Sequence, residues 1–183
     1  MVQSLLYWCD LYKKLRYHAL CLDVECTGSN GPLSVIGLYR PKEGEIDCIS
    51  LVKGKNLNSE ELKKAFEGCK LLITYNGLSF YIKKIDYEFP GVLPKVPVLD
   101  LYLFAKKLNL DTNLKVLETT LGIDRLYEFT KKRDIAVKLW QKYIKNHREE
   151  TLNQLIEYNK QDAINLYPLA EKLVEMALER IEG

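Results

Sequence analysis

Residues 19–28 read A-L-C-L-D-V-E-C-T-G, and this stretch decides the fold. It is apolar up to Glu25 except for Asp23, which predicts a buried strand that ends at Thr27 and Gly28. Side chains two residues apart on a strand point to the same face, so Asp23 and Glu25 stand side by side. Burial and mutual repulsion oppose that arrangement unless a cation lies between the carboxylates. Two interpretations stay open for the pair: a metal site, or a strand end with both acids in solvent.

The segments after this strand predict a sheet with mixed strand directions. Residues 34–39 and 45–52 alternate apolar and polar residues and form a hairpin, and residues 70–76 are apolar enough to be buried on both faces. The other expected elements are helices over 58–68, up to Phe89, over 101–108, from Asn113, over 135–146 and from Glu149 onward, with a strand at 96–101. This order is typical of an α/β fold. Pro168 predicts a kink or a break in the last helix, because proline has no N–H group to donate.

The length of 183 residues, with 47% hydrophobic and 28% charged residues, is typical of one compact domain. Apolar side chains at helical spacing within residues 1–18 predict an amphipathic helix packed on an α/β domain of residues 19–183. A helix on a membrane surface is less favoured, because the basic face is short. No apolar stretch approaches the roughly 20 residues that span a bilayer, so we expect no membrane partner.

Charge and cysteine content exclude several classes of protein. The 27 Lys and Arg against 25 Asp and Glu exclude a disordered polyelectrolyte and a strongly basic nucleic-acid coat, but not a partner recognised by local patches. The five cysteines include no C-x-x-C pair, which argues against a disulfide framework and a structural zinc site. The first residues lack the pattern of a signal peptide. We therefore expect a reducing compartment, the cytoplasm.

A third carboxylate lies far along the chain. Tyr158 and Asp162 are four residues apart on the last predicted helix and therefore share one face. That face carries leucines within residues 155–169, which predicts that it packs against the sheet. An inward aspartate is costly unless it is matched, and Asp23, Glu25 and a cation would match it. The alternative is a core tyrosine with an aspartate at the margin of the helix.

Three carboxylates together would offer the oxygen ligands that Mg²⁺ or Mn²⁺ prefer. Such ions serve phosphoryl transfer, in which one ion lowers the pKa of the attacking water and a second stabilises the leaving oxygen. A tyrosine hydroxyl beside the ions can orient that water or help to deprotonate it. The residues thus point to a Mg²⁺ or Mn²⁺ site that acts on phosphodiesters.

Four stretches in order resemble the motifs of the DEDD-type 3′–5′ exonucleases, in the DnaQ-like subtype with a tyrosine in the last motif. They are L-D-V-E-C-T-G (22–28), T-Y-N-G-L-S-F (74–80), V-L-D-L-Y (98–102) and Y-N-K-Q-D (158–162). The YprB-like ribonuclease-H-like family is the most similar branch, and the resemblance extends from residue 19 to about residue 173. It implies a ribonuclease-H-like α/β fold, in which helices flank a five-stranded mixed sheet whose second strand is antiparallel to the rest.

The resemblance also implies roles for individual residues. Asp23, Glu25 and Asp162 would be metal ligands, and Tyr158 would orient the attacking water, so these four are the predicted catalytic residues. The residues predicted to contact nucleic acid are Thr27, Gly28 and Asn76, near the 3′-terminal nucleotide, together with Tyr81, Lys83 and Lys84. The two lysines follow the second motif as candidate phosphate contacts, and the Tyr81 ring is suited to stack on a base. Asn76 precedes a glycine and is equally typical of a turn.

The second motif departs from the family, in which it ends in Phe-Asp, whereas this chain has Phe80 and Tyr81. Three explanations are open for the absence of an aspartate at position 81. Asp86 or Asp100 could replace it, although Asp86 points elsewhere on a helix and Asp100 is typical of a helix N-cap. Alternatively, catalysis is weakened and one ion is bound firmly, or the chain is a binding module that has lost most turnover.

We therefore expect a metal-dependent 3′–5′ exonuclease that hydrolyses phosphodiester bonds of DNA or RNA, weakened by Tyr81, with a single-stranded 3′ end as its substrate. The expected cofactor is Mg²⁺ or Mn²⁺. A nucleic-acid-binding pseudo-nuclease and a structure-specific endonuclease on the same fold are the alternatives.

Overall fold

The computed structural model describes residues 2–28, 31–42, 45–125 and 134–183. Its centre is a five-stranded sheet in the order β3-β2-β1-β4-β5. The strands are β1 (Ala19–Cys26), β2 (Leu33–Lys42), β3 (Glu45–Val52), β4 (Leu71–Thr74) and β5 (Val98–Asp100). β2 pairs antiparallel with β1 and β3, whereas β4 is parallel to both β1 and β5. The predicted α/β fold, with a five-stranded mixed sheet and an antiparallel second strand, is confirmed.

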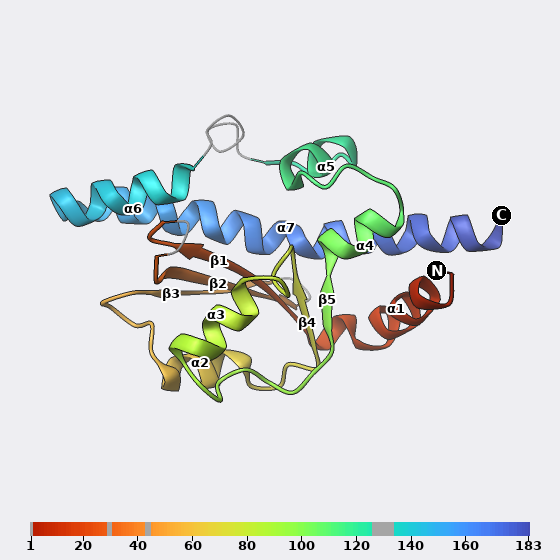
Figure 1. The fold of residues 1–183 in the computed structure, drawn as a ribbon, viewed down its shortest axis with the longest axis horizontal. Coiled ribbons are helices and arrows are strands. Elements are labelled where there is room, and N and C mark those ends of the chain that lie inside the picture. The colour runs from red at the N-terminus through yellow and green to blue at the C-terminus, as the bar shows by residue number, and fades with distance from the viewer. Residues whose placement is uncertain (1, 29–30, 43–44, 126–133) are drawn as a thin grey trace.

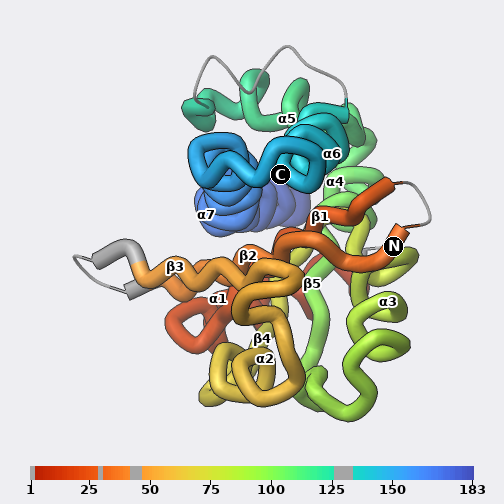
Figure 2. The backbone as a smooth tube through the Cα atoms, turned by 90° about the vertical axis from the view of Figure 1, so that its left-hand side faces the viewer, coloured from red at the N-terminus to blue at the C-terminus, as the bar shows by residue number. Residues whose placement is uncertain are grey.

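Helices cover both faces of this sheet (Figures 1 and 2). The long α7 (Glu149–Glu182) lies along one face, where α1 (Val2–Leu15), α4 (Leu101–Lys107), α5 (Leu114–Thr120) and α6 (Ile135–Asn146) join it. The other face packs against α2 (Ser59–Phe66) and α3 (Tyr81–Glu88), and a 3-10 turn (Arg16–His18) links α1 to β1. Asn58 and Asn113 cap α2 and α5 by accepting N–H groups of the first turn, as their positions predict.

Successive side chains of β1 point to opposite faces of the sheet, and this places the acids on one of the two faces. Leu20, Leu22 and Val24 are buried on the side of α2 and α3. Cys21 is buried on the other side, in a cluster with α1, α4 and α7. Asp23 therefore continues the face that α7 covers. The face is apolar at its start and acidic at its end, so the carboxylates lie at the margin of the core.

The last helix does not break at Pro168, so a break, one of the two outcomes expected there beside a kink, is excluded. α7 continues for 34 residues with Pro168 inside it. A proline in a helix interior costs about 3 kcal/mol. Leucines on both sides of it, Leu166 and Leu169, are completely buried against the sheet, and their packing outweighs that cost. Tyr158 and Asp162 are consequently held on one uninterrupted helix.

The N-terminal helix packs on the end of the sheet and on α7. Its Leu5, Cys9 and Tyr12 are buried in the cluster that contains Leu173 and Ala177 of α7. Among the helices that the structure describes, none combines the length and the apolar composition that crossing a bilayer requires.

Candidate active site

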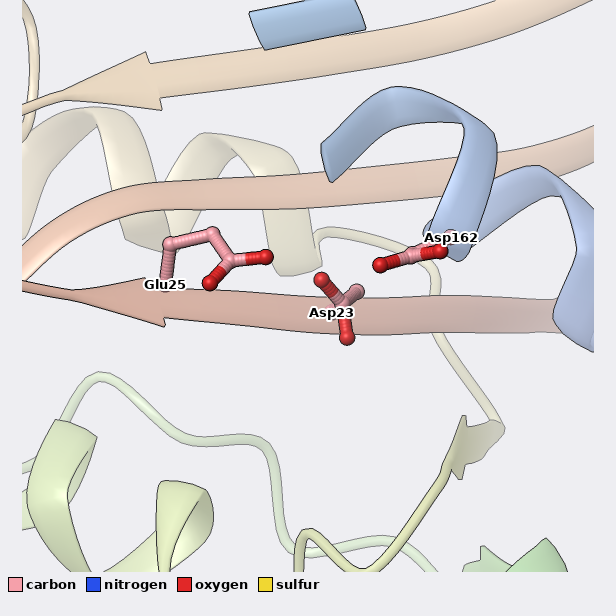
Figure 3. A group of neighbouring side chains, drawn as sticks. All are labelled: Asp23, Glu25 and Asp162. Carbon is pink, nitrogen blue, oxygen red and sulfur yellow. The ribbon is translucent and has the colours of Figure 1, made fainter. Parts of the chain in front are cut away.

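Asp23, Glu25 and Asp162 come together at one point of the molecule. Asp23 and Glu25 project from β1 and Asp162 projects from α7, with the three carboxylates turned toward one another (Figure 3). One oxygen atom from each carboxylate lies within 4.8 Å of the others. The arrangement excludes the solvated strand end as an account of the β1 pair. Three oxygen donors at this separation fit a hard divalent cation such as Mg²⁺ or Mn²⁺.

The electrostatics of the group favour a bound cation. Burial raises the pKa of Asp23 well above its ordinary value, and the charge of Asp162 raises it further. Burial likewise raises the pKa of Glu25, with added repulsion from Asp23 and Asp162. Burial raises the pKa of Asp162 as well, although the guanidinium of Arg125 opposes that rise. Three ionised carboxylates in this place are unstable without a positive charge between them.

A buried asparagine positions the first of the acids. The Asn159 side chain is completely buried, and its Nδ2 donates a hydrogen bond to Oδ2 of Asp23 over 2.8 Å. Asn159 reaches Asp23 because Gly37 stands opposite Asp23 in the β1–β2 pairing. A Cβ atom on Gly37 would lie 2.3 Å from Oδ1 of Asn159, so only glycine leaves room for the amide.

Replacing Gly37 by alanine is therefore expected to destabilise the protein. Over-packing of a core costs about 1–3 kcal/mol, and each kcal/mol lowers the melting temperature of a chain of this length by about 2–4 °C. Gly28→Ala is the control, because no atom lies within 4 Å of the added Cβ there. Thermal unfolding followed by circular dichroism measures the effect. Equal melting temperatures for Gly37→Ala and Gly28→Ala would contradict the close approach of Asn159.

Basic side chains also face the acids. Arg125 forms an ion pair with Asp162 and a second one with Glu118. Lys115 of α5 interacts electrostatically with Asp162 and Glu25, and its Nζ lies 5.4 Å from the ring centre of Tyr158. Burial and the adjacent Arg125 lower the pKa of Lys115. The site is thus acidic at its centre and basic at its edge, which suits a bound phosphate beside a metal ion.

The three acids line a cavity of about 720 Å³. Four tyrosines line the same cavity: Tyr75, Tyr81, Tyr102 and Tyr158. The Tyr75 and Tyr102 rings meet edge to face at 6.0 Å, and the Tyr75 hydroxyl donates to the carbonyl of Thr112 over 2.8 Å, which fixes this wall. Aromatic rings beside carboxylates offer stacking surfaces for unpaired bases.

Comparison with known proteins adds the family. A family model described as "RNase_H superfamily" matches residues 20–174. The chain belongs to the RNase_H superfamily. A solved structure described as "apo form of the nuclease" superposes with a TM-score of 0.62 at 19% sequence identity, over 92% of this chain and 77% of that one. That likeness shows the fold. A search of curated proteins gave no match.

In this member of the RNase_H superfamily, the predicted site residues fall into two groups. Asn76 and Tyr81 line the acidic cavity with Tyr158. Asn76 is also a turn residue, since its φ of 57° is left-handed and its N–H donates to Asp100. The remaining predicted nucleic-acid contacts, Thr27, Gly28, Lys83 and Lys84, lie outside the cavity lining, and their roles stay predictions. Lys84 is engaged by Glu88 at 3.8 Å.

No fourth carboxylate joins the three acids in the described part of the chain. Asp86 is exposed on α3, and Asp100 is occupied as an N-cap that accepts N–H groups from Asn76, Leu78 and Tyr102. Tyr81, at the start of α3, faces the acids instead. Burial raises the pKa of Tyr81, and the charges of Asp23 and Glu25 raise it further, so its hydroxyl remains neutral.

Sequence reasoning missed three residues of the site: Asn159, Lys115 and Arg125. A signal was present for Asn159, because Gly37 interrupts an otherwise apolar strand and such a glycine indicates a close approach of another group. Lys115 and Arg125 lie within residues 19–173, where the chain resembles the family, but the resemblance implied no role for either residue.

Proposed function

We propose that the protein is a divalent-cation-dependent 3′–5′ exonuclease of the DEDD type, in the DnaQ-like subtype with tyrosine and nearest to the YprB-like family. Its substrate would be the single-stranded 3′ end of DNA or RNA. The observation that carries the proposal is the meeting of Asp23, Glu25 and Asp162 in the lining of a cavity that four tyrosines also line. Membership in the RNase_H superfamily and the nuclease fold support it.

The three carboxylates would hold Mg²⁺ or Mn²⁺, which supplies Lewis-acid activation of a water and of the phosphate when bound. Asp23 is held in place for this by Asn159, and Asp162 by Arg125. Both supports lie inside the protein, so the oxygen donors are oriented before a ligand arrives. The protein thus provides a preformed site at the carboxyl end of β1.

Tyr158 orients the attacking water in this proposal and does not act as the base. Burial raises the pKa of Tyr158 far above neutrality, and the charge of Asp162 raises it further, so the hydroxyl keeps its proton. The Tyr158 side chain hydrogen-bonds Asp162, which lowers the pKa of that acid. A neutral hydroxyl fixed on a ligand carboxylate can bind a water in one orientation.

The proposal is tested with end-labelled single strands of DNA and of RNA, incubated with Mn²⁺ or Mg²⁺ beside an Asp23→Ala control. The expected result is stepwise shortening from the 3′ end by the wild-type chain and loss of that activity in the control. Labels at the 5′ and 3′ ends distinguish the direction of attack. Degradation at equal rates in both proteins would refute the proposal, because a contaminant would then account for it.

A circular single strand separates the proposed exonuclease from an endonuclease, since an exonuclease requires an end. Survival of the circle beside degradation of the linear strand supports the proposal, whereas cleavage of the circle favours the endonuclease. Binding of single strands without any hydrolysis favours the pseudo-nuclease, for which Tyr81 in place of a fourth acid is the specific observation.

A further inference from the structure

Arg125 is an internal cation of the candidate site. Its guanidinium contacts Oδ1 of Asp162 through Nη1 and, on its other edge, donates from Nε and Nη2 to Glu118 over 2.8 and 2.9 Å. The side chain is 4% exposed, compared with 1% for Glu118 and 8% for Asp162. Surface ion pairs contribute little, but a buried bidentate pair fixes a guanidinium in one orientation.

A second asparagine, Asn165, helps to fix the Arg125 side chain relative to the three acids. Asn165 lies three residues after Asp162 on α7, and its Nδ2 donates to Oε1 of Glu118 over 3.1 Å. The same amide donates to the carbonyl of Asp124 over 3.2 Å, which ties the segment before Arg125 to α7. Arg125 and Asp162 are therefore anchored to one helix, and the guanidinium stays beside the site.

The charges around the site match one divalent cation better than two. The carboxylates of the acidic group and of its buried ion pair are Asp23, Glu25, Asp162 and Glu118, and the basic groups that interact with them are Arg125 and Lys115. This set has an excess of two negative charges. Asp134 also lines the cavity, but it is exposed and lies outside the acidic group. The hydroxyl-bearing Tyr81, which carries no negative charge, lines the cavity beside the acids. Hydrogen bonds or ion pairs also engage one oxygen of Asp23 and one of Asp162.

We propose that the site takes a single divalent cation and that the buried Arg125 guanidinium, paired with Asp162 and outside the cavity lining, supplies the second positive charge of the site. The inference rests on the proposed phosphodiester hydrolysis for its purpose, but the number of ions bound does not depend on it. A fixed guanidinium in the protein interior stabilises negative charge that develops near the site at longer range, because the low dielectric there weakens its field less than water would. The three carboxylates with Arg125 thus form a one-cation variant of the acidic site.

The number of ions is measured by calorimetric titration with Mn²⁺, with and without saturating adenosine and thymidine 5′-monophosphates. The nucleotides are included because a second ion could otherwise lack its phosphate ligand. The wild-type chain is expected to bind one Mn²⁺ in both conditions. Two Mn²⁺ per chain in the presence of either nucleotide would overturn the proposal.

The role of Arg125 is measured with Arg125→Met and Arg125→Lys, and with Glu118→Gln/Arg125→Met, which avoids an unpaired buried carboxylate. Loss of the cation that opposes Asp162 is expected to tighten Mn²⁺ binding about tenfold in Arg125→Met. Both Met variants should bind Mn²⁺ more tightly than the wild-type chain, with a smaller gain in the double variant, because it also loses the negative charge of Glu118. The hydrolysis rate is expected to fall at least about 100-fold in the same variants. Arg125→Lys keeps the charge and should retain wild-type Mn²⁺ affinity and part of the rate. Arg180→Met, at the far end of α7, is the control and should change neither.

A tighter Mn²⁺ affinity together with a slower hydrolysis rate would show that Arg125 acts through its charge and does not only position Asp162. If Arg125 only positioned Asp162, all three variants would bind Mn²⁺ more weakly, and that result would overturn the proposal. If the wild-type chain binds one Mn²⁺ and the Met variants bind it more tightly, but no strand is hydrolysed, the one-cation site stands and the proposed nuclease function fails. Circular dichroism confirms that each variant is folded before titration.

Discussion

The Glu25→Gln variant is expected to lose about 10³-fold in the rate of Mn²⁺-dependent hydrolysis and, in EDTA, to melt about 4 °C above the wild-type chain. The rate falls because an amide replaces one of three anionic ligands. The melting temperature rises because the charge that is removed is penalised by burial and by repulsion from Asp23 and Asp162. Glu25 makes no side-chain hydrogen bond within the described part of the chain, so the substitution breaks none there.

A glutamate of α7 that lies outside the acidic group provides the control. Glu157→Gln changes an exposed residue of α7 whose carboxylate lies 3.7 Å from Lys160. It is expected to leave the rate unchanged and the melting temperature within about 2 °C, as for most surface substitutions. Activity is measured on an end-labelled strand and stability by thermal unfolding. A loss of both activity and stability in Glu25→Gln would mean that Glu25 supports the fold and is not a ligand.

The acids of the site could be predicted as candidates, because each is a charged residue within an apolar stretch or on an apolar face. Asp23 lies within an apolar strand, and Glu25 shares its face. Asp162 lies on the face of α7 that the leucines bury. Burial conflicts with charge at all three positions, and one cation resolves the three conflicts together. The sequence alone left a solvated strand end and an aspartate at the helix margin open, and the tertiary structure removes the first by placing the three acids together.

The supports of those acids could not be predicted in the same way. Asn159 and Arg125 are polar residues whose sequence neighbours give no reason to place them inside, and only the tertiary structure brings them to Asp23 and Asp162. Asp100 shows the reverse case, because its chemistry fitted both a ligand and a helix cap. Asp100 caps α4 by accepting the N–H of Tyr102, and its two oxygens also accept N–H groups of Asn76 and Leu78 from the turn after β4. These last two contacts are non-local, and they occupy the carboxylate.

The helices and strands themselves were largely predictable, because periodicity and caps are local. The break at Pro168 was wrong for a reason that is not local. A proline penalty is a property of the chain, whereas the burial of Leu166 and Leu169 is a property of the sheet beneath them. Packing energies of several side chains exceed one lost hydrogen bond, so the tertiary contact overrides the local rule.

The metal-free protein is expected to lose stability as the pH rises from about 5 to 8. Burial raises the pKa values of Asp23 and Glu25 in the folded state well above their ordinary values of 3.8 and 4.5. The folded chain therefore binds more protons than the unfolded chain between those values and the folded pKa values, and its stability falls with pH across that interval. Each proton lost costs up to about 1.4 kcal/mol per pH unit, or about 3–5 °C in melting temperature.

A divalent cation should reverse this trend. Cations bind the ionised carboxylates, so the stabilisation by saturating Mn²⁺ is expected to grow with pH, while protons compete for the same oxygens at low pH. Melting temperatures from pH 5 to 8, in EDTA and in Mn²⁺, measure both trends. The double variant Asp23→Asn/Glu25→Gln isolates the contribution of the site, because the other carboxylates of the chain titrate in both proteins. Parallel curves for the two proteins in EDTA would show that Asp23 and Glu25 are ionised in the folded state without a cation, which contradicts the electrostatics of the site.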